Sequence, residues 1–310
     1  MALAGCGEAV RERPATLLLD FTPNAAHTGI FSAAARGYDR RAGVRLAVRQ
    51  PSASTDSVKL LVAGRADAAV LDIHDLAIAR ERGRDVVGVL PLVERPLAAV
   101  LTLPGVHTPR QLEGRRVGVT GLPSDDAVLR SIVRGAGGHP GRVRTVTIGF
   151  NAVVGLLTRR VAGATGFWNV EGVALRRRGP DYGEFRVDSY GAPAYPELVV
   201  CVTGRTLRRR PALVRALRRA LTRGYQFALA HPRAAVRDLV ARAPGLDRSV
   251  ASDQLAAIRP AMTLGGRFGV LDPVRLRAWA AWEARFGVVR RPPDVARAFD
   301  LAGGGRAPGG

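Results

Sequence analysis

Lysine, cysteine and long apolar runs are scarce in this chain of 310 residues. Lys59 is the only lysine, so arginine carries almost all of the basic charge. No apolar run approaches the roughly 20 residues that span a bilayer, and the sequence therefore predicts no membrane-spanning helix. Hydrophobic residues make up 47% and charged residues 24%, which is typical of a globular protein rather than a disordered one. The length suffices for two α/β lobes, each with its own core.

The net charge of +21 raises nucleic acid and anionic membrane surfaces as partners. The arginines are scattered, however, and form only short runs such as 176–178 and 208–210. No aromatic residues interleave with them in the kind of basic stripe that stacks bases. The abundance of Ala, Gly, Arg, Val and Pro is also what a GC-rich coding sequence would produce. We therefore expect no nucleic-acid partner.

The two cysteines do not look like a disulfide pair. Cys6 ends the segment Leu3-Ala4-Gly5-Cys6, which resembles the lipobox where a bacterial signal peptidase cuts before a cysteine to be lipidated. Only five residues precede Cys6, whereas a signal segment has a charged and an apolar stretch upstream. Two interpretations stay open: a mis-assigned start with lipidation of Cys6, or a disordered N-terminus with a chance match. Cys201 lies in an apolar run and is expected to be a buried small hydrophobic residue.

Short apolar runs alternate with helical patterns along most of the chain. They predict strands over 16–20, 44–48, 68–71 and 86–92, with helices between them over 28–38, 54–63 and 75–82. After Pro104 the alternation restarts, with strands over 115–120, 143–148, 164–168, 184–187 and 198–203 and helices over 126–135 and 152–160. From Arg208 the pattern is helical, over 213–230, 232–241, 249–261, 273–286 and 295–301. This alternation indicates parallel sheets flanked by helices.

The second α/β half is inserted between the first half and the helical return, which predicts two lobes and two crossings. One lobe is expected to comprise residues 15–101 and 202–301, and the other residues 102–201. Residues 1–14 then form an N-terminal linker, and the Gly-rich tail 302–310 should be disordered. The cleft between such lobes is the default ligand site, and closure around a ligand is a hinge motion.

The most informative stretch follows the first predicted strand: Asp20-Phe21-Thr22-Pro23-Asn24-Ala25-Ala26-His27. In an open α/β sheet, ligands lie outside the carboxyl ends of the strands, so this loop is expected to bring Asp, Asn and His to a ligand. The alternative is that Asp20 and Asn24 only shape a turn and cap a helix.

This stretch resembles the D-[WF]-x-P-N-x-x-H motif of bacterial thiamine-pyrimidine-precursor-binding proteins, which share a fold with the fungal thiamine pyrimidine synthase. A second match, Gly166-Phe167-Trp168-Asn169-Val170-Glu171-Gly172, is similar to the W-N-x-E element of that family. By the order of elements the resemblance covers about residues 15–260. It implies the α/β fold of the type II periplasmic binding proteins, in which two lobes with parallel-rich sheets are joined by two crossing strands.

A flat aminopyrimidine, the ligand that the resemblance implies, has two apolar faces and polar edges. Trp168 and Phe21 are expected to cover the faces. Asp20 and Glu171 are expected to accept hydrogen bonds from an amine or a protonated ring nitrogen. The remaining edges are expected to pair with side chains of the same two motifs: Asn24, His27 and Asn169. For Trp168 the alternative is a plain core residue, since tryptophan is usually well buried.

Polar residues after two further predicted strands should reach the same cleft. In Asp72-Ile73-His74-Asp75, we expect His74 to contact a ligand edge and Asp75 to cap the next helix. The spacing is not that of a recognised metal motif. Ser124 lies at a predicted helix N-terminus, where an anionic or carbonyl oxygen is favoured. The second lobe then offers three further candidates for ligand contact: Ser124, Asp125 and Tyr190.

These features predict the extracytoplasmic solute-binding subunit of an ABC importer, a monomer that captures a small heteroaromatic molecule. The expected ligand is a thiamine pyrimidine precursor, and the expected partners are the ABC permease and ATPase subunits. A lipid on Cys6 would anchor the protein to the membrane. Riboflavin- and sulfonate-binding proteins of related build are the alternatives, although the two motifs contain no arginine clamp for a sulfonate.

Two other classes are weighed against the importer subunit. The fungal synthase uses a lysine to hold pyridoxal phosphate and a nearby histidine as a substrate. In an ungapped alignment Leu71 stands at the lysine position and Asp75 at the histidine position, and the cysteine-rich segment has no counterpart. A transcription regulator would need a helix-turn-helix, for which residues 1–15 are too short. We therefore expect no catalytic residues, no cofactor and no metal.

Overall fold

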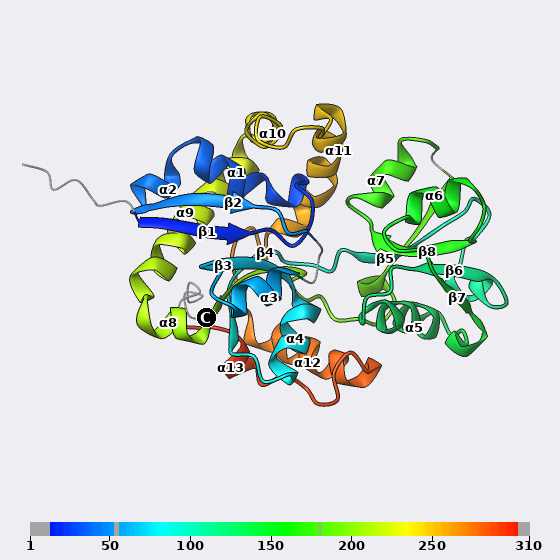
Figure 1. The fold of residues 1–310 in the computed structure, drawn as a ribbon. Coiled ribbons are helices and arrows are strands. Elements are labelled where there is room, and N and C mark those ends of the chain that lie inside the picture. The colour runs from blue at the N-terminus through cyan, green and yellow to red at the C-terminus, as the bar shows by residue number, and fades with distance from the viewer. Residues whose placement is uncertain (1–12, 53–55, 180, 303–310) are drawn as a thin grey trace, which may run out of the picture.

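The computed structural model describes residues 13–52, 56–179 and 181–302, which form two α/β lobes (Figure 1). The first lobe combines the N-terminal elements with the C-terminal helices, and the second is built from the middle of the chain. Cys6 and residues 303–310 lie outside the described residues, so the lipid anchor and the disordered tail stay predictions. Within the described ranges, no helix combines the length and the apolarity that a membrane crossing requires.

The sheet of the first lobe has five strands in the order β2-β1-β3-β10-β4. They are β1 (Arg13–Leu18), β2 (Val44–Arg49), β3 (Ala68–Asp72), β4 (Val86–Val93) and β10 (Leu198–Thr203). β1 pairs in parallel with β2 and β3, whereas β10 runs antiparallel to both β3 and β4. The Val- and Leu-rich β4 is buried along its whole length, the pattern of a strand covered on both faces.

The sheet of the second lobe repeats this plan in the order β7-β6-β8-β5-β9. Its strands are β5 (Ala98–Thr102), β6 (Arg116–Val119), β7 (Arg144–Thr147), β8 (Gly163–Phe167) and β9 (Gly183–Arg186). β6 pairs in parallel with β7 and β8, whereas β5 runs antiparallel to β8 and β9. Each sheet therefore contains one strand of opposite direction, and that strand arrives from the other lobe.

The chain crosses between the lobes at residues 94–97, before β5, and at residues 187–197, before β10. Residues 98–101 thus belong to the second sheet and residues 198–201 to the first, each four residues before the boundary expected from the sequence. The sequence pattern does not predict β5 at all. The expected mixture of parallel-rich sheets, two lobes and two crossings is confirmed.

Helices surround both sheets (Figure 1). In the first lobe they are α1 (Thr28–Ala35), α2 (Tyr38–Arg41), α3 (Asp56–Val62), α4 (Ile73–Glu81), α8 (Gly204–Arg209), α9 (Pro211–Ala230), α10 (Pro232–Val240), α11 (Arg248–Ile258), α12 (Pro273–Phe286) and α13 (Val295–Ala298). In the second lobe they are α5 (Asp125–Gly135), α6 (Ala152–Leu157) and α7 (Glu171–Arg176).

The loop that follows β1 is held by the packing of α1 against α9. Gly224 of α9 approaches α1 so closely that a Cβ atom there would lie 2.0 Å from the carbonyl oxygen of Gly29. Beside it, the hydroxyl of Tyr225 donates to the carbonyl oxygen of Ala26, at 2.7 Å. The backbone of residues 20–27 is therefore anchored directly to the longest helix.

Two helix pairs connect the lobes. The indole N–H of Trp282 in α12 donates to Oγ of Ser131 in α5, at 3.1 Å. Arg177, at the end of α7, donates to Oγ of Ser249 in α11, at 2.9 Å, and also pairs with Asp253. These helix pairs bring the lobes into contact outside the crossing segments.

Candidate functional site

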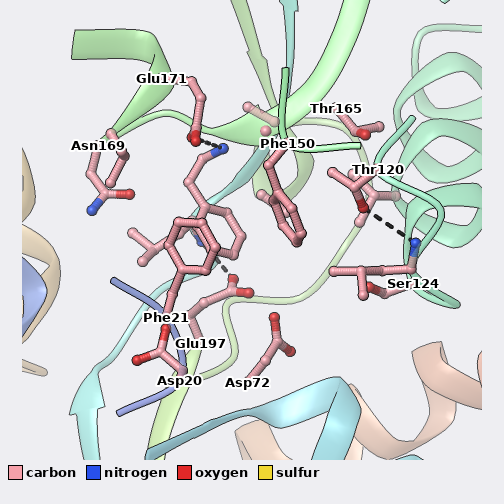
Figure 2. A pocket seen from close by; sticks show the side chains of 18 of the residues that line it. Asp20, Phe21, Asp72, Thr120, Ser124, Phe150, Thr165, Asn169, Glu171 and Glu197 are labelled. Carbon is pink, nitrogen blue, oxygen red and sulfur yellow. Dashed lines mark hydrogen bonds between the residues drawn. The ribbon is translucent and has the colours of Figure 1, made fainter. Parts of the chain in front are cut away.

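A cavity between the lobes is lined from both of them and from both crossing segments (Figure 2). The first lobe contributes the loop after β1 and the start of α4, and the second lobe contributes the loops after β6, β7 and β8. Each of these segments follows the carboxyl end of a strand, where ligands lie in α/β folds. The cavity has a volume of about 100 Å³, which is enough for several water molecules and thus for a small organic ligand.

The loop after β1 places Asp20, Phe21 and Asn24 in the cavity wall. Nδ1 of the fully buried His27 accepts the backbone N–H of Asn24, at 3.2 Å. Its proton must therefore sit on Nε2, which donates to Oδ1 of Asp20 at 2.7 Å. His27 does not line the cavity, so its expected contact with a ligand is corrected to a supporting role: it aims the carboxylate of Asp20.

Asn24 shapes the turn after β1 and also lies in the cavity wall. Its Oδ1 accepts the N–H of Ala26 at 2.9 Å, and its Nδ2 donates to the carbonyl oxygen of Thr22 at 3.1 Å. These bonds cap the short 3-10 helix Ala25–His27. The side chain lines the cavity, but its amide is already engaged in shaping the turn.

Three phenylalanines, rather than Trp168, supply the aromatic wall of the cavity: Phe21, Phe150 and Phe167. Trp168 is 2% exposed and does not line the cavity. Its indole N–H donates to the carbonyl oxygen of Pro96 at 2.9 Å, and the guanidinium of Arg186 lies 4.0 Å from its ring centroid. The expected stacking role of Trp168 is therefore corrected: it is a core residue that fixes the first crossing segment.

Asn169 and Glu171, from the same motif as Trp168, both reach the cavity (Figure 2). Asn169 is 1% exposed, and its Oδ1 has no hydrogen-bond partner in the described part of the chain. Glu171 accepts the N–H of Phe167 at 2.9 Å, and burial raises the pKa of its carboxyl group. A ligand with a hydrogen-bond donor near Asn169 would satisfy that buried oxygen.

Ser124 and Asp125 both line the cavity at the start of α5. The carboxylate of Asp125 turns back toward the preceding loop, where Oδ2 accepts from Thr120 Oγ1 and the Gly121 N–H, each at 2.7 Å. Its Oδ1 accepts from Thr165 Oγ1 at 3.0 Å. Asp125 thus positions two threonine hydroxyls, and Ser124 makes no capping bond with its side chain.

The segment after β3 differs from the expected arrangement. Asp72, not Asp75, caps α4, because its Oδ1 accepts the N–H of His74 at 2.8 Å. Both ring nitrogens of His74 are occupied, Nδ1 by Glu283 and Nε2 by the hydroxyl of Tyr195 at 3.2 Å. Burial alone would lower the pKa of His74, but Glu283 and Asp72 outweigh it and raise the pKa to about 10. The ring nitrogens of His74 are therefore not available to a ligand, and only the surface of its ring faces the cavity. The expected contact between His74 and a polar edge of the ligand is corrected accordingly.

Four carboxyl groups from the first lobe and the second crossing lie around the cavity: Asp20, Asp72, Asp75 and Glu197. Glu197 is fully buried and accepts the N–H of Leu97 at 2.6 Å. Burial and the neighbouring Asp72 raise the pKa of Glu197 well above its usual value. Burial and Asp72 also raise the pKa of Asp75, to about 7. Within the part of the chain that the structure describes, no lysine or arginine lines the cavity.

The donor set does not fit a metal ion or pyridoxal phosphate. Among the described residues, Asp72, His74 and Glu197 place potential ligand atoms within 4.8 Å of one another. Both His74 nitrogens are committed to Glu283 and Tyr195, so no imidazole lone pair is available. The only lysine, Lys59, has a side chain that is 73% exposed and lies outside the cavity lining, and Leu71 is buried in β3.

Tyr190 is a candidate that the structure does not bring to the cavity, because its ring packs edge-on against Phe185, with centroids 5.8 Å apart.

Several cavity residues are not identified by the sequence motifs. Glu197 lies immediately before the apolar run 198–202, and this polar residue at the start of a buried strand is the signal for it. Polar and aromatic lining residues for which the sequence predicts no ligand contact include Thr120, Phe150, Thr165, Phe167 and Glu197, whereas Asp72 belongs to a segment that is expected to reach the cleft.

Two lobes with matching mixed sheets, two crossings and a cavity between them define the type II periplasmic-binding-protein fold. The periplasmic aliphatic sulphonate binding protein of Escherichia coli superimposes with a TM-score of 0.75 at 13% identity, over 92% of this chain and 91% of that one. The ligand-binding component of an ABC-type import system from Staphylococcus aureus, solved with zinc bound, gives a TM-score of 0.75 at 12% identity, over 96% and 100%. At these identities the likeness establishes the fold.

Residues 24–235 match the NMT1/THI5-like family, and the chain belongs to it. The formylaminopyrimidine-binding protein of Halalkalibacterium halodurans is 29% identical over 219 residues, which span 70% of this chain and 66% of that protein. The 4-amino-5-hydroxymethyl-2-methylpyrimidine phosphate synthase THI5 of Saccharomyces cerevisiae is 24% identical over 253 residues, or 77% and 74% of the two chains. The resemblance inferred from the two sequence motifs is thereby confirmed.

Proposed function

We propose that this protein is the solute-binding subunit of an ABC importer and captures a flat, donor-rich heteroaromatic molecule, namely a thiamine pyrimidine precursor. The fold and the 29% identity to a formylaminopyrimidine-binding protein support this proposal. One observation of the site carries the choice of ligand. Among the described residues, no lysine or arginine lines the cavity, whereas six carboxyl-bearing residues do: Asp20, Asp72, Asp75, Asp125, Glu171 and Glu197.

The chemistry of the walls fits an aminopyrimidine. The three phenylalanine rings offer apolar surfaces to the two faces of a flat ring. Carboxylates and the free Oδ1 of Asn169 are hydrogen-bond acceptors, which suits the exocyclic amine and N–H groups of such a ring. The hydroxyls of Thr120 and Thr165 donate their hydrogens to Asp125, so their oxygens offer a ligand acceptors only.

The same lining disfavours the alternative of a sulfonate. An anionic head group needs cationic or N–H donors, and the carboxyl groups that line the cavity supply neither. The lining therefore disfavours an anionic ligand, although the chain as a whole carries a net charge of +21.

An enzyme of the synthase type is disfavoured by the absence of a suitable lysine. A Schiff base with pyridoxal phosphate needs a lysine amine in the cavity, and the described lining residues include none. They include no arginine either, and both ring nitrogens of His74 are committed to Glu283 and Tyr195, so the phosphate of that cofactor finds no cationic partner among them. We therefore propose binding without turnover, although relatives named as synthases match the chain at 24% identity.

The proposal extends to location and partners. A solute-binding subunit works outside the cytoplasm, delivers its ligand to the permease and ATPase subunits, and needs no second copy of itself. Cys6 would hold it at the membrane through a lipid. Closure of the lobes around the ligand would then present the loaded form to the permease.

A thermal-shift screen tests the ligand class. Formylaminopyrimidine, hydroxymethylpyrimidine, riboflavin and an aliphatic sulfonate are each added at increasing concentration. A true ligand at about 100 times its Kd adds roughly 2.7 kcal/mol to the unfolding free energy and raises Tm accordingly. A shift with the sulfonate alone would contradict the proposal, and so would release of a product from any pyrimidine.

A further inference from the structure

Asp72 and Glu197 face each other in the floor of the cavity, although they come from different segments. Asp72 ends β3, and Glu197 lies in the second crossing, directly before β10. Oxygen atoms of the two carboxyl groups lie within 4.8 Å of each other. Carboxylate oxygens are acceptors only, so a hydrogen bond between the two groups can form only while one of them carries a proton.

The remaining contacts of Glu197 leave one oxygen without a donor. Its Oε2 accepts the N–H of Leu97 at 2.6 Å. Its Oε1 is buried and receives no N–H or O–H from the described residues. Glu197 is 0% exposed and lines the cavity, so this oxygen is a buried acceptor that a ligand can satisfy.

The charges around the pair favour retention of that proton. Asp20 and Asp75 are two further carboxyl groups in the lining, and burial and Asp72 raise the pKa of Asp75 to about 7, so Asp75 adds negative charge only as the pH rises past that value. The nearby cation is His74, but its two ring N–H groups point to Glu283 of α12 and to Tyr195 of the crossing. Two adjacent carboxyl groups without a cation between them cannot both ionise at low cost. In agreement, burial and Asp72 raise the pKa of Glu197 well above its usual value.

We propose that the Asp72–Glu197 pair holds one shared proton in the ligand-free protein and is the subsite for a planar cation of the amidinium type. Such a group presents two N–H donors on one edge, which match oxygens of the two carboxyl groups. A protonated aminopyrimidine presents the same edge through its ring N–H and its exocyclic amine. The inference rests on the proposed function and specifies the charge state in which the ligand is bound.

The proton balance depends on the ligand. A ligand that is already a cation in solution replaces the shared proton, which passes to the solvent, and the pair becomes a dianion beside the cation. A neutral aminopyrimidine instead takes the shared proton onto its ring nitrogen, and no net proton is exchanged. By linkage, the affinity of the cation rises about tenfold per pH unit while the pair still holds its proton. The affinity of the neutral ligand does not rise with pH in this range.

Titration calorimetry with benzamidine and its neutral isostere benzamide tests this subsite. Benzamidine stays protonated across the neutral range, and the two molecules share shape and ring. Each is titrated in phosphate and in Tris at the same pH, because the difference in enthalpy counts the protons released. We expect release of about one proton with benzamidine, none with benzamide, and at least tenfold weaker binding of benzamide.

Glu197→Gln is the matching variant, because glutamine keeps an acceptor for the N–H of Leu97. Without the second carboxyl group no proton is shared, so benzamidine should bind this variant with equal enthalpy in both buffers and with no rise in affinity between pH 6 and 8. Asp126→Asn is the control, since Asp126 is 67% exposed and lies outside the cavity lining. It should release the same number of protons as the parent protein.

The outcomes separate this inference from the proposed function. Binding of a pyrimidine precursor with no benzamidine binding, or with no proton release by the parent protein, overturns the subsite and leaves the importer function standing. Equal proton release by Glu197→Gln also overturns it. Proton release with benzamidine, but no response to any pyrimidine, supports the subsite and contradicts the pyrimidine ligand.

Discussion

The rings of Phe21 and Phe150 belong to different lobes, and their centroids lie 5.1 Å apart at an interplanar angle of 38°. Phe21 follows β1 in the first lobe, and Phe150 precedes α6 in the second (Figure 2). Because each ring lines the cavity, the pair closes it from both sides at once. A contact that exists only when the lobes are together stabilises the closed form, and a ligand between or beside the rings adds to it.

Phe150→Ala should weaken binding of the pyrimidine ligand with little effect on the fold. Phe150 is 50% exposed, so its removal leaves no large core cavity. Loss of one aromatic contact with the ligand and of the contact with Phe21 should cost about 1–2 kcal/mol, or roughly a 5- to 30-fold rise in Kd. Titration calorimetry measures it, with Val154→Ala as control, because Val154 is 53% exposed and does not line the cavity. Equal Kd values for the parent protein and Phe150→Ala would refute the aromatic wall.

Unlike Phe150→Ala, the variant Trp168→Ala should lower the stability of the protein. The indole is almost fully buried and bonds to the carbonyl oxygen of Pro96. Truncation of a buried tryptophan costs about 3–5 kcal/mol, and the lost hydrogen bond leaves a buried carbonyl without a donor. Urea denaturation should show a lower midpoint for this variant. A normal midpoint together with lost ligand binding would instead show that Trp168 contacts the ligand.

The sequence predicts the positions of strand ends well, and therefore which loops reach the cavity. Alternating apolar runs locate β1, β3 and β8, and polar residues that directly follow them do line it. The sequence does not predict the direction of each side chain, because that direction is fixed by contacts with residues distant in sequence. Trp168 is held by Pro96, and His74 by Glu283, 209 residues further along the chain. No local pattern contains that information.

The missed strand β5 has a similar cause. Its sequence Ala98–Thr102 is rich in alanine, which has low strand propensity, and prolines stand close on either side. The strand forms because it pairs on both sides, with β8 and with the edge strand β9, and the chain enters it from the other lobe. Tertiary pairing outweighs local preference in this segment.

Gly224→Ala should destabilise the first lobe and disturb the loop after β1. The added methyl group would lie 2.0 Å from the carbonyl oxygen of Gly29, and backbone atoms cannot move aside as a flexible side chain can. Overpacking of this kind costs about 1–3 kcal/mol or more, because α1 and α9 must separate. Gly141→Ala is the control, since nothing lies within 4 Å of its added methyl group. Thermal denaturation of both variants should show a lower Tm for Gly224→Ala alone, and equal Tm values would contradict the close packing.

Cys6 should be the lipidated first residue of the mature protein, after removal of a signal segment encoded upstream in frame. The motif Leu3-Ala4-Gly5-Cys6 motivates this prediction. Intact-mass analysis of the native, membrane-associated protein should give the mass of a chain that begins at Cys6 plus the lipid. A Cys6→Ser variant should be neither cut there nor lipidated. An unprocessed chain that begins at Met1 would rule the anchor out.

Stability should fall as pH rises, because three buried groups hold protons more tightly in the folded chain than in the unfolded one. Burial raises the pKa of Asp75 from 3.8 to about 7 and that of Glu94 from 4.5 to about 7. Glu283 and Asp72, against the effect of burial, raise the pKa of His74 from 6.5 to about 10. A raised folded-state pKa contributes stability that is fully present below the unfolded-state value and is lost as pH rises toward the folded-state value. The losses therefore fall in two windows, from about pH 4 to 7 for the carboxyl groups and from about pH 6.5 to 10 for the imidazole.

Each proton that the folded state holds in excess lowers the unfolding free energy by about 1.4 kcal/mol per pH unit within its window. Urea denaturation of the ligand-free protein from pH 5 to 9 should thus show a steadily falling midpoint. His74→Gln removes the contribution of the imidazole, so its stability should fall below that of the parent protein at pH 5 and decrease less steeply than that of the parent above pH 7. His107→Gln is the control, because His107 is an exposed residue far from α4 in sequence. A parent midpoint that rises between pH 7 and 9 would mean that His74 is neutral in the folded protein, and the bond to Glu283 would then lack its ionic character.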